Sequence, residues 1–120
     1  MLDLNHKKQS FYKASMALVT VCYQTLEKVS DGERFGLISQ IKRAAISIPL
    51  NIAEGASRAS AKERRRFYDI ARSSAVEVDT GFEILVRLGL LTTEDLKELD
   101  PLLQECFRQL SNVINSLKSI

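Results

Sequence analysis

Hydrophobic residues recur every three or four positions along most of the chain, a spacing that places them on one side of an α-helix. Four such stripes are separated by short breaks, and they predict helices over about residues 4–29, 34–57, 60–88 and 93–119. We expect the stripe positions to be buried. In chain order they are Phe11, Ser15, Leu18, Cys22, Thr25 and Val29; Ile38, Ile41, Ala45, Ile48 and Ile52; Phe67, Ala71, Ser74, Val78, Gly81, Leu85 and Leu88; and Leu99, Leu103, Cys106, Leu110, Val113, Leu117 and Ile120.

The breaks between the stripes carry the residues that begin and end helices. Residues 30–32, Ser-Asp-Gly, are typical of a turn after the first helix. Gly55 lowers helix propensity near the end of the second helix, and Ser60 with Glu63 forms the sequence of a capping box that begins the third. Gly89 is a natural stop for the third helix.

Two prolines fall inside the predicted helices. Pro49 removes one backbone donor and crowds the carbonyl four residues earlier, at a cost of roughly 3 kcal/mol, so we expect a bend between Ala45 and Pro49. Asn51 follows this bend, and we expect it to satisfy carbonyls that the bend releases. Pro101, preceded by Asp100, either lies at the start of a helix that follows a short turn or marks a kink.

Four stripes joined by short connections predict an all-α fold, an antiparallel up-and-down four-helix bundle that forms a single domain over residues 1–120. A second apolar row widens three of the faces, with Ala14, Val21, Ile70, Phe82, Leu102 and Ile114. Such a wide face indicates either contact with another subunit or a broad core in a lone bundle. We favour the homo-oligomer, in part because of the resemblance described below.

The composition is that of an ordinary globular chain, with 45% hydrophobic and 27% charged residues. Residues 1–10 contain no apolar signal region, and no apolar run is long enough to cross a membrane, so we expect a cytoplasmic protein. Cys22 and Cys106 match neither metal-ligand nor redox spacing. We interpret them as reduced core thiols, and a reactive role is the alternative.

Enzyme classes are poorly supported. His6 is the only histidine, which argues against a di-iron carboxylate site, Ser-His-Asp or Cys-His catalysis and most zinc sites. Glu77, Asp79 and Glu83 have no companions that would complete a metal site, so we interpret them as solvent-exposed or ion-paired. The sequence also lacks a glycine-rich phosphate loop. We therefore expect no catalytic residues, no metal and no cofactor.

Charge is unevenly distributed along the chain. Residues 40–75 contain eight cations and three acids, a balance of +5, whereas residues 76–120 contain four cations and eight acids, a balance of −4. The candidate RNA-binding residues are Lys42, Arg43, Arg58, Lys62, Arg64, Arg65 and Arg66. The planar guanidinium group of arginine and the free backbone N–H groups at a helix N-terminus can both donate hydrogen bonds to phosphate oxygens.

The alternative interpretation of this charge is a solvated helix surface with pairs such as Glu63 with Arg66. Stacking on aromatic side chains would strengthen the case for single-strand binding. Phe67 falls on the core stripe, which leaves Tyr68 as the exposed aromatic candidate. Binding would therefore depend mainly on phosphates, with strong salt dependence.

Residues 48–55, Ile-Pro-Leu-Asn-Ile-Ala-Glu-Gly, followed by Arg58, Ser60, Lys62-Glu63 and Arg66-Phe67, closely resemble the signature of a four-helix-bundle family encoded in intervening sequences of bacterial 23S rRNA genes. The resemblance continues upstream through Phe35-Gly36-Leu37 and residues 40–45, and downstream to residues 88–91. The chain departs from the pattern at Arg64-Arg65 and at residues 72–75.

This resemblance implies an antiparallel bundle that commonly assembles as a ring-like homopentamer. Family members are also similar to accessory proteins of diversity-generating retroelements, basic oligomers that bind RNA and a reverse transcriptase. It assigns no chemistry to the signature residues Pro49, Asn51, Glu54 and Gly55, for which we expect structural roles, with Glu54 pairing with Arg58. A biochemical activity is not established for most of the family, whose members also carry ribosomal-protein labels.

Two functions therefore remain. The first is a non-enzymatic homo-oligomer, with a pentamer favoured, that binds structured RNA or an RNA-protein assembly such as one with a reverse-transcriptase-like protein. The second is a structural or protein-interaction module whose cations only keep it soluble. Neither function involves a membrane.

Overall fold

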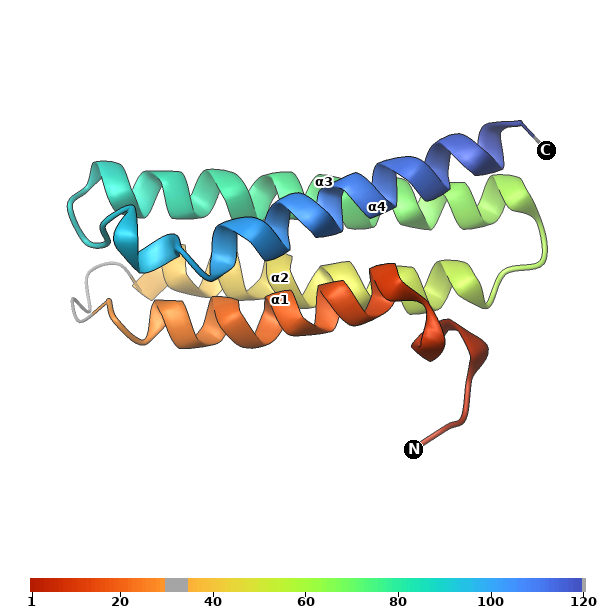
Figure 1. The fold of residues 1–120 in the computed structure, drawn as a ribbon, viewed down its shortest axis with the longest axis horizontal. Coiled ribbons are helices and arrows are strands. Elements are labelled where there is room, and N and C mark those ends of the chain that lie inside the picture. Colours follow the sequence, from red (N-terminus) through yellow and green to blue (C-terminus); the bar gives the residue numbers. More distant parts are fainter. Residues whose placement is uncertain (30–34, 120) are drawn as a thin grey trace.

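The computed structural model describes residues 1–29 and 35–119, which fold into four α-helices. These are α1 (Ser10–Leu26), α2 (Phe35–Ala56), α3 (Ala61–Arg87) and α4 (Leu99–Lys118) (Figure 1). Two short 3-10 helices, η1 (Asn5–Lys8) and η3 (Glu94–Leu96), precede α1 and α4. The described residues contain no strand, which confirms the predicted all-α class.

Each α-helix packs against two others. α1 and α3 both contact α2 and α4, and α2 and α3 share the most extensive interface. The resulting body is elongated, with extents of 46 × 31 × 22 Å. Among the described helices, none combines the length and the apolar content that a membrane span requires.

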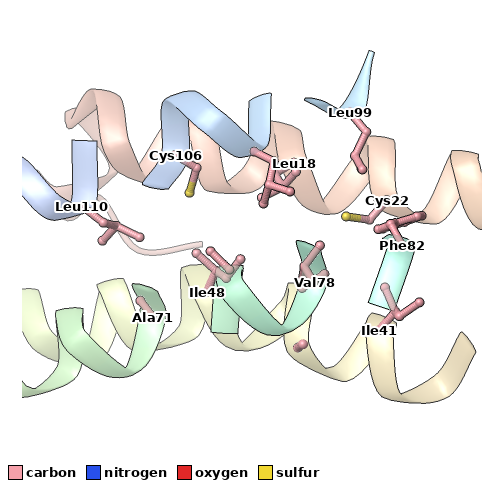
Figure 2. Packing of buried hydrophobic residues seen from close by; sticks show 14 of the residues in the cluster. Leu18, Cys22, Ile41, Ile48, Ala71, Val78, Phe82, Leu99, Cys106 and Leu110 are labelled. Carbon is pink, nitrogen blue, oxygen red and sulfur yellow. The ribbon is translucent and has the colours of Figure 1, made fainter. Parts of the chain in front are cut away.

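The core lies between the four helices, and the stripe positions fill it (Figure 2). Leu18 and Cys22 of α1 meet Ile41 and Ile48 of α2 and Phe82 of α3 there, all with almost no solvent exposure. The prediction of core positions is therefore confirmed for most of each stripe. Cys22 and Cys106 are buried free thiols, as expected.

Some stripe predictions are wrong at the helix ends. Leu88 is exposed because α3 ends at Arg87, and the chain then turns away. Ile114 replaces Val113 as the fully buried residue late in α4. Ile120 lies outside the described residues. Of the second apolar row, Phe82 and Ile114 belong to the core, whereas Ile70 is exposed.

Two helix starts were predicted too early. α1 begins at Ser10, because the η1 turn is followed by Gln9 with an extended backbone (φ −73°, ψ 137°). α4 begins at Leu99 after the η3 turn, which places Pro101 in the first turn, where its missing N–H has no partner within the helix. Pro101 is the third residue of α4 and not its first, although it lies in the turn where the first alternative placed it. The predicted turn at residues 30–32 and the predicted start at residue 34 lie outside the described part of the chain.

The caps of α3 are confirmed. Ser60 Oγ accepts a hydrogen bond from the Glu63 amide at 3.1 Å, as the capping box requires. At the other end Gly89 adopts a positive φ of 76°, and the Leu90 amide donates to the Leu85 carbonyl at 3.0 Å. This is the Schellman arrangement that a glycine makes possible.

Pro49 is buried within α2, which is assigned as one continuous helix on both sides of it. Asn51 does not satisfy the carbonyl of Ala45, the one that Pro49 leaves without a donor. Its Nδ2 instead donates to Ser47, to the carbonyl oxygen at 2.8 Å and to Oγ at 2.9 Å. Ser47 Oγ in turn is hydrogen-bonded to Ser74 Oγ of α3 at 2.9 Å. Asn51 therefore helps to join α2 to α3.

Candidate nucleic-acid interface

The connection between α2 and α3 lies at one end of the bundle, and Gly55 determines how closely the two helices meet there (Figure 1). Gly55 is buried and is the second-to-last residue of α2, so the helix ends near this glycine as predicted. A Cβ at this position would lie 2.8 Å from Cε1 of Tyr68 and 3.0 Å from Cβ of Phe67. The glycine therefore makes room for the first turns of α3.

Tyr68 is the buried aromatic residue of this region, and Phe67 is the partly exposed one, so the predicted assignment was reversed. Tyr68 is 5% exposed and packs edge-on against Phe11, with ring centroids 5.5 Å apart. Burial raises the pKa of the Tyr68 phenol, and the Arg64 guanidinium acts in the opposite direction. Gly55 and Phe11 pack against the first turns of α3 on the side of Tyr68. The buried side of α3 is therefore not the side that the stripe predicted at this point.

Phe67 is flanked by two arginines. The guanidinium carbon of Arg58 lies 5.0 Å from the centre of the Phe67 ring, and that of Arg66 lies 5.1 Å from it. Both distances are within the range of cation–π attraction. Both guanidinium groups therefore contact the same aromatic ring beside the α2–α3 connection.

Other contacts secure the same end of the molecule. Arg58 Nη2 lies 2.6 Å from Glu54 Oε1, which confirms the expected pair. Arg64 Nε donates to the Arg58 carbonyl at 2.8 Å, so Arg64 fixes the backbone of the connection. The predicted pair of Glu63 with Arg66 is also present, at 3.7 Å.

Lys62, Arg65 and Arg66 line an open hollow of about 650 Å³ on the first turns of α3, together with Ser60, Glu63, Asp69 and Ile70. Three cations and two acids thus surround this hollow. We call Arg58, Lys62, Arg64, Arg65 and Arg66, with Phe67, the basic end. It contains five of the seven candidate cations.

Lys42 and Arg43 are not part of the basic end. At 1.5 Å per residue, the helix between Arg43 and Ala56 spans ~20 Å. The Lys42 ammonium instead lies 4.9 Å from the centre of the Tyr23 ring of α1. The structure therefore divides the predicted cation set into two groups, since proximity in the sequence along a helix is not proximity in space.

Two buried thiols and three exposed carboxylates lie outside the basic end. Burial raises the pKa of Cys22 to about 12, with Cys106 adding to the effect, and burial alone raises that of Cys106 to about 12. Protonated thiols are poor nucleophiles. Glu77, Asp79 and Glu83 are exposed, and Glu83 pairs with Arg87 at 3.7 Å. In the described ranges, His, Cys, Asp and Glu side chains form no cluster of three that could hold a metal.

Sequence reasoning missed the position of Phe67 between two arginines. The available signal was the Arg66-Phe67 pair itself, with Arg58 one short connection away. It also missed a groove between α3 and α4, because the residues that line it are far apart in the chain.

Comparison with known proteins identifies the family to which the chain belongs. No curated protein matches the chain. The model of the 23S rRNA-intervening sequence protein family matches residues 7–112, which include α1, α2, α3 and most of α4. The resemblance seen in the signature at residues 48–55 is thereby confirmed. The chain belongs to the family of 23S rRNA-intervening sequence proteins.

Proposed function

We propose that this protein is a non-enzymatic, homo-oligomeric helical bundle that binds RNA, or an RNA-protein assembly, through its basic end. The observation that carries the proposal is the position of Phe67 between Arg58 and Arg66, beside the hollow lined by Lys62 and Arg65. Planar guanidinium groups held in one place suit phosphate oxygens and can also stack on bases.

The ion pairs at the basic end do not prevent phosphate binding. Glu54 with Arg58 and Glu63 with Arg66 are pairs between exposed side chains, which contribute only about 0–1 kcal/mol. A phosphate can therefore replace either carboxylate at little cost.

The bundle is inferred to be antiparallel. Early α2 residues contact late α3 residues, as with Ile41 and Gly81, whereas late α2 residues contact early α3 residues, as with Gly55 and Tyr68. The resemblance to the family favours a ring-like homopentamer in the cytoplasm, with a structured RNA or a reverse-transcriptase-like protein as partner. Such a ring would present several copies of the basic end to one RNA and raise its avidity.

RNA binding is tested with a pair of variants matched in charge. Lys62→Glu with Arg65→Glu alters the hollow, whereas Arg87→Glu with Lys97→Glu makes the same charge change at the other end of α3 and beyond it. Wild-type protein is expected to bind a structured RNA, with an affinity that falls steeply as salt increases. The first variant should lose about two units of the salt slope, and the second should keep the wild-type slope.

Filter binding or fluorescence anisotropy over a salt series measures these slopes, and circular dichroism verifies that both variants fold. Absent binding in the wild-type protein, or equal losses in both variants, would overturn the RNA proposal.

A second candidate is a structural or protein-interaction module without RNA binding. The observation that favours it is the set of large hydrophobic side chains exposed on the helices, among them Leu50 and Phe107. Pull-down from the native host after nuclease treatment should then still recover one protein in stoichiometric amount. Loss of that protein on nuclease treatment would count against this candidate.

A further inference from the structure

An apolar strip runs along the outer side of α1 and α2. On α1 it consists of Tyr12, Met16, Val19 and Tyr23, spaced so that they share one helix face next to the core stripe. Met16 is 47% exposed, and the other three are half-buried. These side chains are more apolar than a solvated helix face requires.

The strip continues onto α2 with Ile46 and Leu50, and Leu50 is 63% exposed. The contact of Lys42 with the Tyr23 ring shows that this side of α2 meets the same side of α1. Arg43 lies three residues before Ile46 and seven before Leu50, and therefore shares their face. We call Tyr12, Met16, Val19, Tyr23, Ile46 and Leu50, with the cations Lys42 and Arg43, the α1–α2 strip.

A groove of opposite character lies between α3 and α4. It has a volume of about 290 Å³ and is lined by Val76 and Phe107, which are 50% and 42% exposed, and by the carboxylates Asp79 and Asp100. A neighbouring hollow of about 340 Å³ shares both carboxylates and adds Glu83. We call the two hollows together the α3–α4 groove.

The strip and the groove lie on opposite sides of the bundle. α1 and α3 each contact both α2 and α4, so the surface between α1 and α2 is opposite the surface between α3 and α4. The strip offers protruding apolar side chains with cations, and the groove offers an apolar recess with carboxylates. Arg72, at the Phe107 end of the groove, has its charge offset by Asp69 at 3.4 Å.

We propose that the α3–α4 groove of one copy of this chain binds the α1–α2 strip of the next. Complementary charge identifies the occupant as a second copy, since the groove's carboxylates match Lys42 and Arg43 of the strip. A symmetric contact of strip with strip would instead place these cations against each other. This inference rests on the proposed homo-oligomer and names the surfaces that build it.

The contact has two consequences. Because each copy carries a strip and a groove on opposite sides, the interface is head-to-tail and builds a ring when the rotation closes. It also assigns Lys42 and Arg43 to assembly, which accounts for their distance from the basic end.

The test measures mass in solution by sedimentation or light scattering, without RNA. Wild-type protein is expected to be oligomeric, and Leu50→Asp should be monomeric, since it places a charge in the middle of the apolar contact. Lys42→Glu with Arg43→Glu should also fail to assemble, as should Asp79→Lys with Asp100→Lys. Circular dichroism verifies that each variant folds.

The decisive experiment combines the charge reversals. An equimolar mixture of the two double variants should recover species larger than a monomer, in which the two variants alternate, because each reversed surface then meets its complement on the other variant. A single chain that carries all four substitutions should assemble like the wild type. An oligomeric wild type whose mass none of the variants changes would overturn this interface and leave the homo-oligomer intact. A monomeric wild type would overturn both, whereas RNA binding is decided separately by the salt series.

Discussion

Ile41 of α2 occupies the space in which a side chain on Gly81 of α3 would have to lie. A Cβ on Gly81 would overlap Cγ1 of Ile41 and would be 2.9 Å from its Cδ1. Both residues are buried, and the Ile41 side chain lies directly against the backbone of Gly81. Together with Gly55 and Tyr68 at the other end, this contact fixes α2 against α3, which have the most extensive interface in the bundle.

Gly81→Ala is expected to destabilise the protein by about 1–3 kcal/mol, because the added methyl group overpacks the core. We expect this loss of stability even though alanine favours a helix over glycine by about 1 kcal/mol. Urea denaturation followed by circular dichroism measures it. The matched control is Gly36→Ala in α2, where a Cβ meets nothing within 4 Å, and which should be neutral or stabilising. Equal effects of the two substitutions would contradict the close contact of Ile41 with Gly81.

Tyr68→Ala and Phe67→Ala are expected to differ in their effect on stability. Tyr68 is buried against Phe11, so its loss should cost about 3 kcal/mol or more. Phe67 is only half-buried, and its loss should cost about 1 kcal/mol. Denaturant midpoints of the two variants measure the difference. A larger loss for Phe67→Ala would restore the assignment that the helical stripe predicted.

The two thiols are expected to be unreactive in the native protein. Cys22 and Cys106 are fully buried, with pKa values of about 12. A disulfide-exchange reagent should therefore modify neither thiol near neutral pH until the protein is unfolded, when it should modify both. Rapid modification of either thiol in the folded protein would favour the reactive role.

These raised pKa values also predict a loss of stability at alkaline pH. The stabilisation is fully present below the unfolded thiol pKa of about 9, and it is lost as pH rises toward the folded value of about 12. The free energy of unfolding should therefore fall as pH rises through this window, because the unfolded chain ionises its thiols before the folded one does. In the Cys22→Ala, Cys106→Ala double variant the free energy of unfolding should decline less steeply with pH. The difference from the wild type gives the contribution of the thiols, apart from that of tyrosine and lysine side chains. Identical slopes in the variant and the wild type would show that thiol ionisation makes no contribution.

The core could be predicted from the sequence because burial follows the helical period. Ile41, Ile48 and Ile52 recur at the spacing of one helix face, and all three are buried. The capping box at Ser60 and the stop at Gly89 were also predictable, since both are local hydrogen-bonding arrangements. The errors occur where a helix ends, as at Leu88, because the neighbours that decide burial there come from other elements.

The candidate site could be predicted only in part. The pair of Arg58 with Glu54 is four residues apart, so helical spacing indicated it. The place of Phe67 between Arg58 and Arg66, and the reversal with Tyr68, depend on how Gly55 of α2 meets α3. The distance between Gly55 and the first turns of α3 cannot be read from a sequence pattern.

The sequence by itself determined the all-α class, the four helical stripes and the family, because each depends on the order and spacing of residues within one segment. Only the tertiary structure decided which of the candidate cations lie close together on the surface. It separated Lys42 and Arg43 from the basic end and formed a carboxylate-lined groove from Asp79 of α3 and Asp100 of α4. The physical reason is that charge and shape at a surface depend on distances between elements, which packing of the core sets.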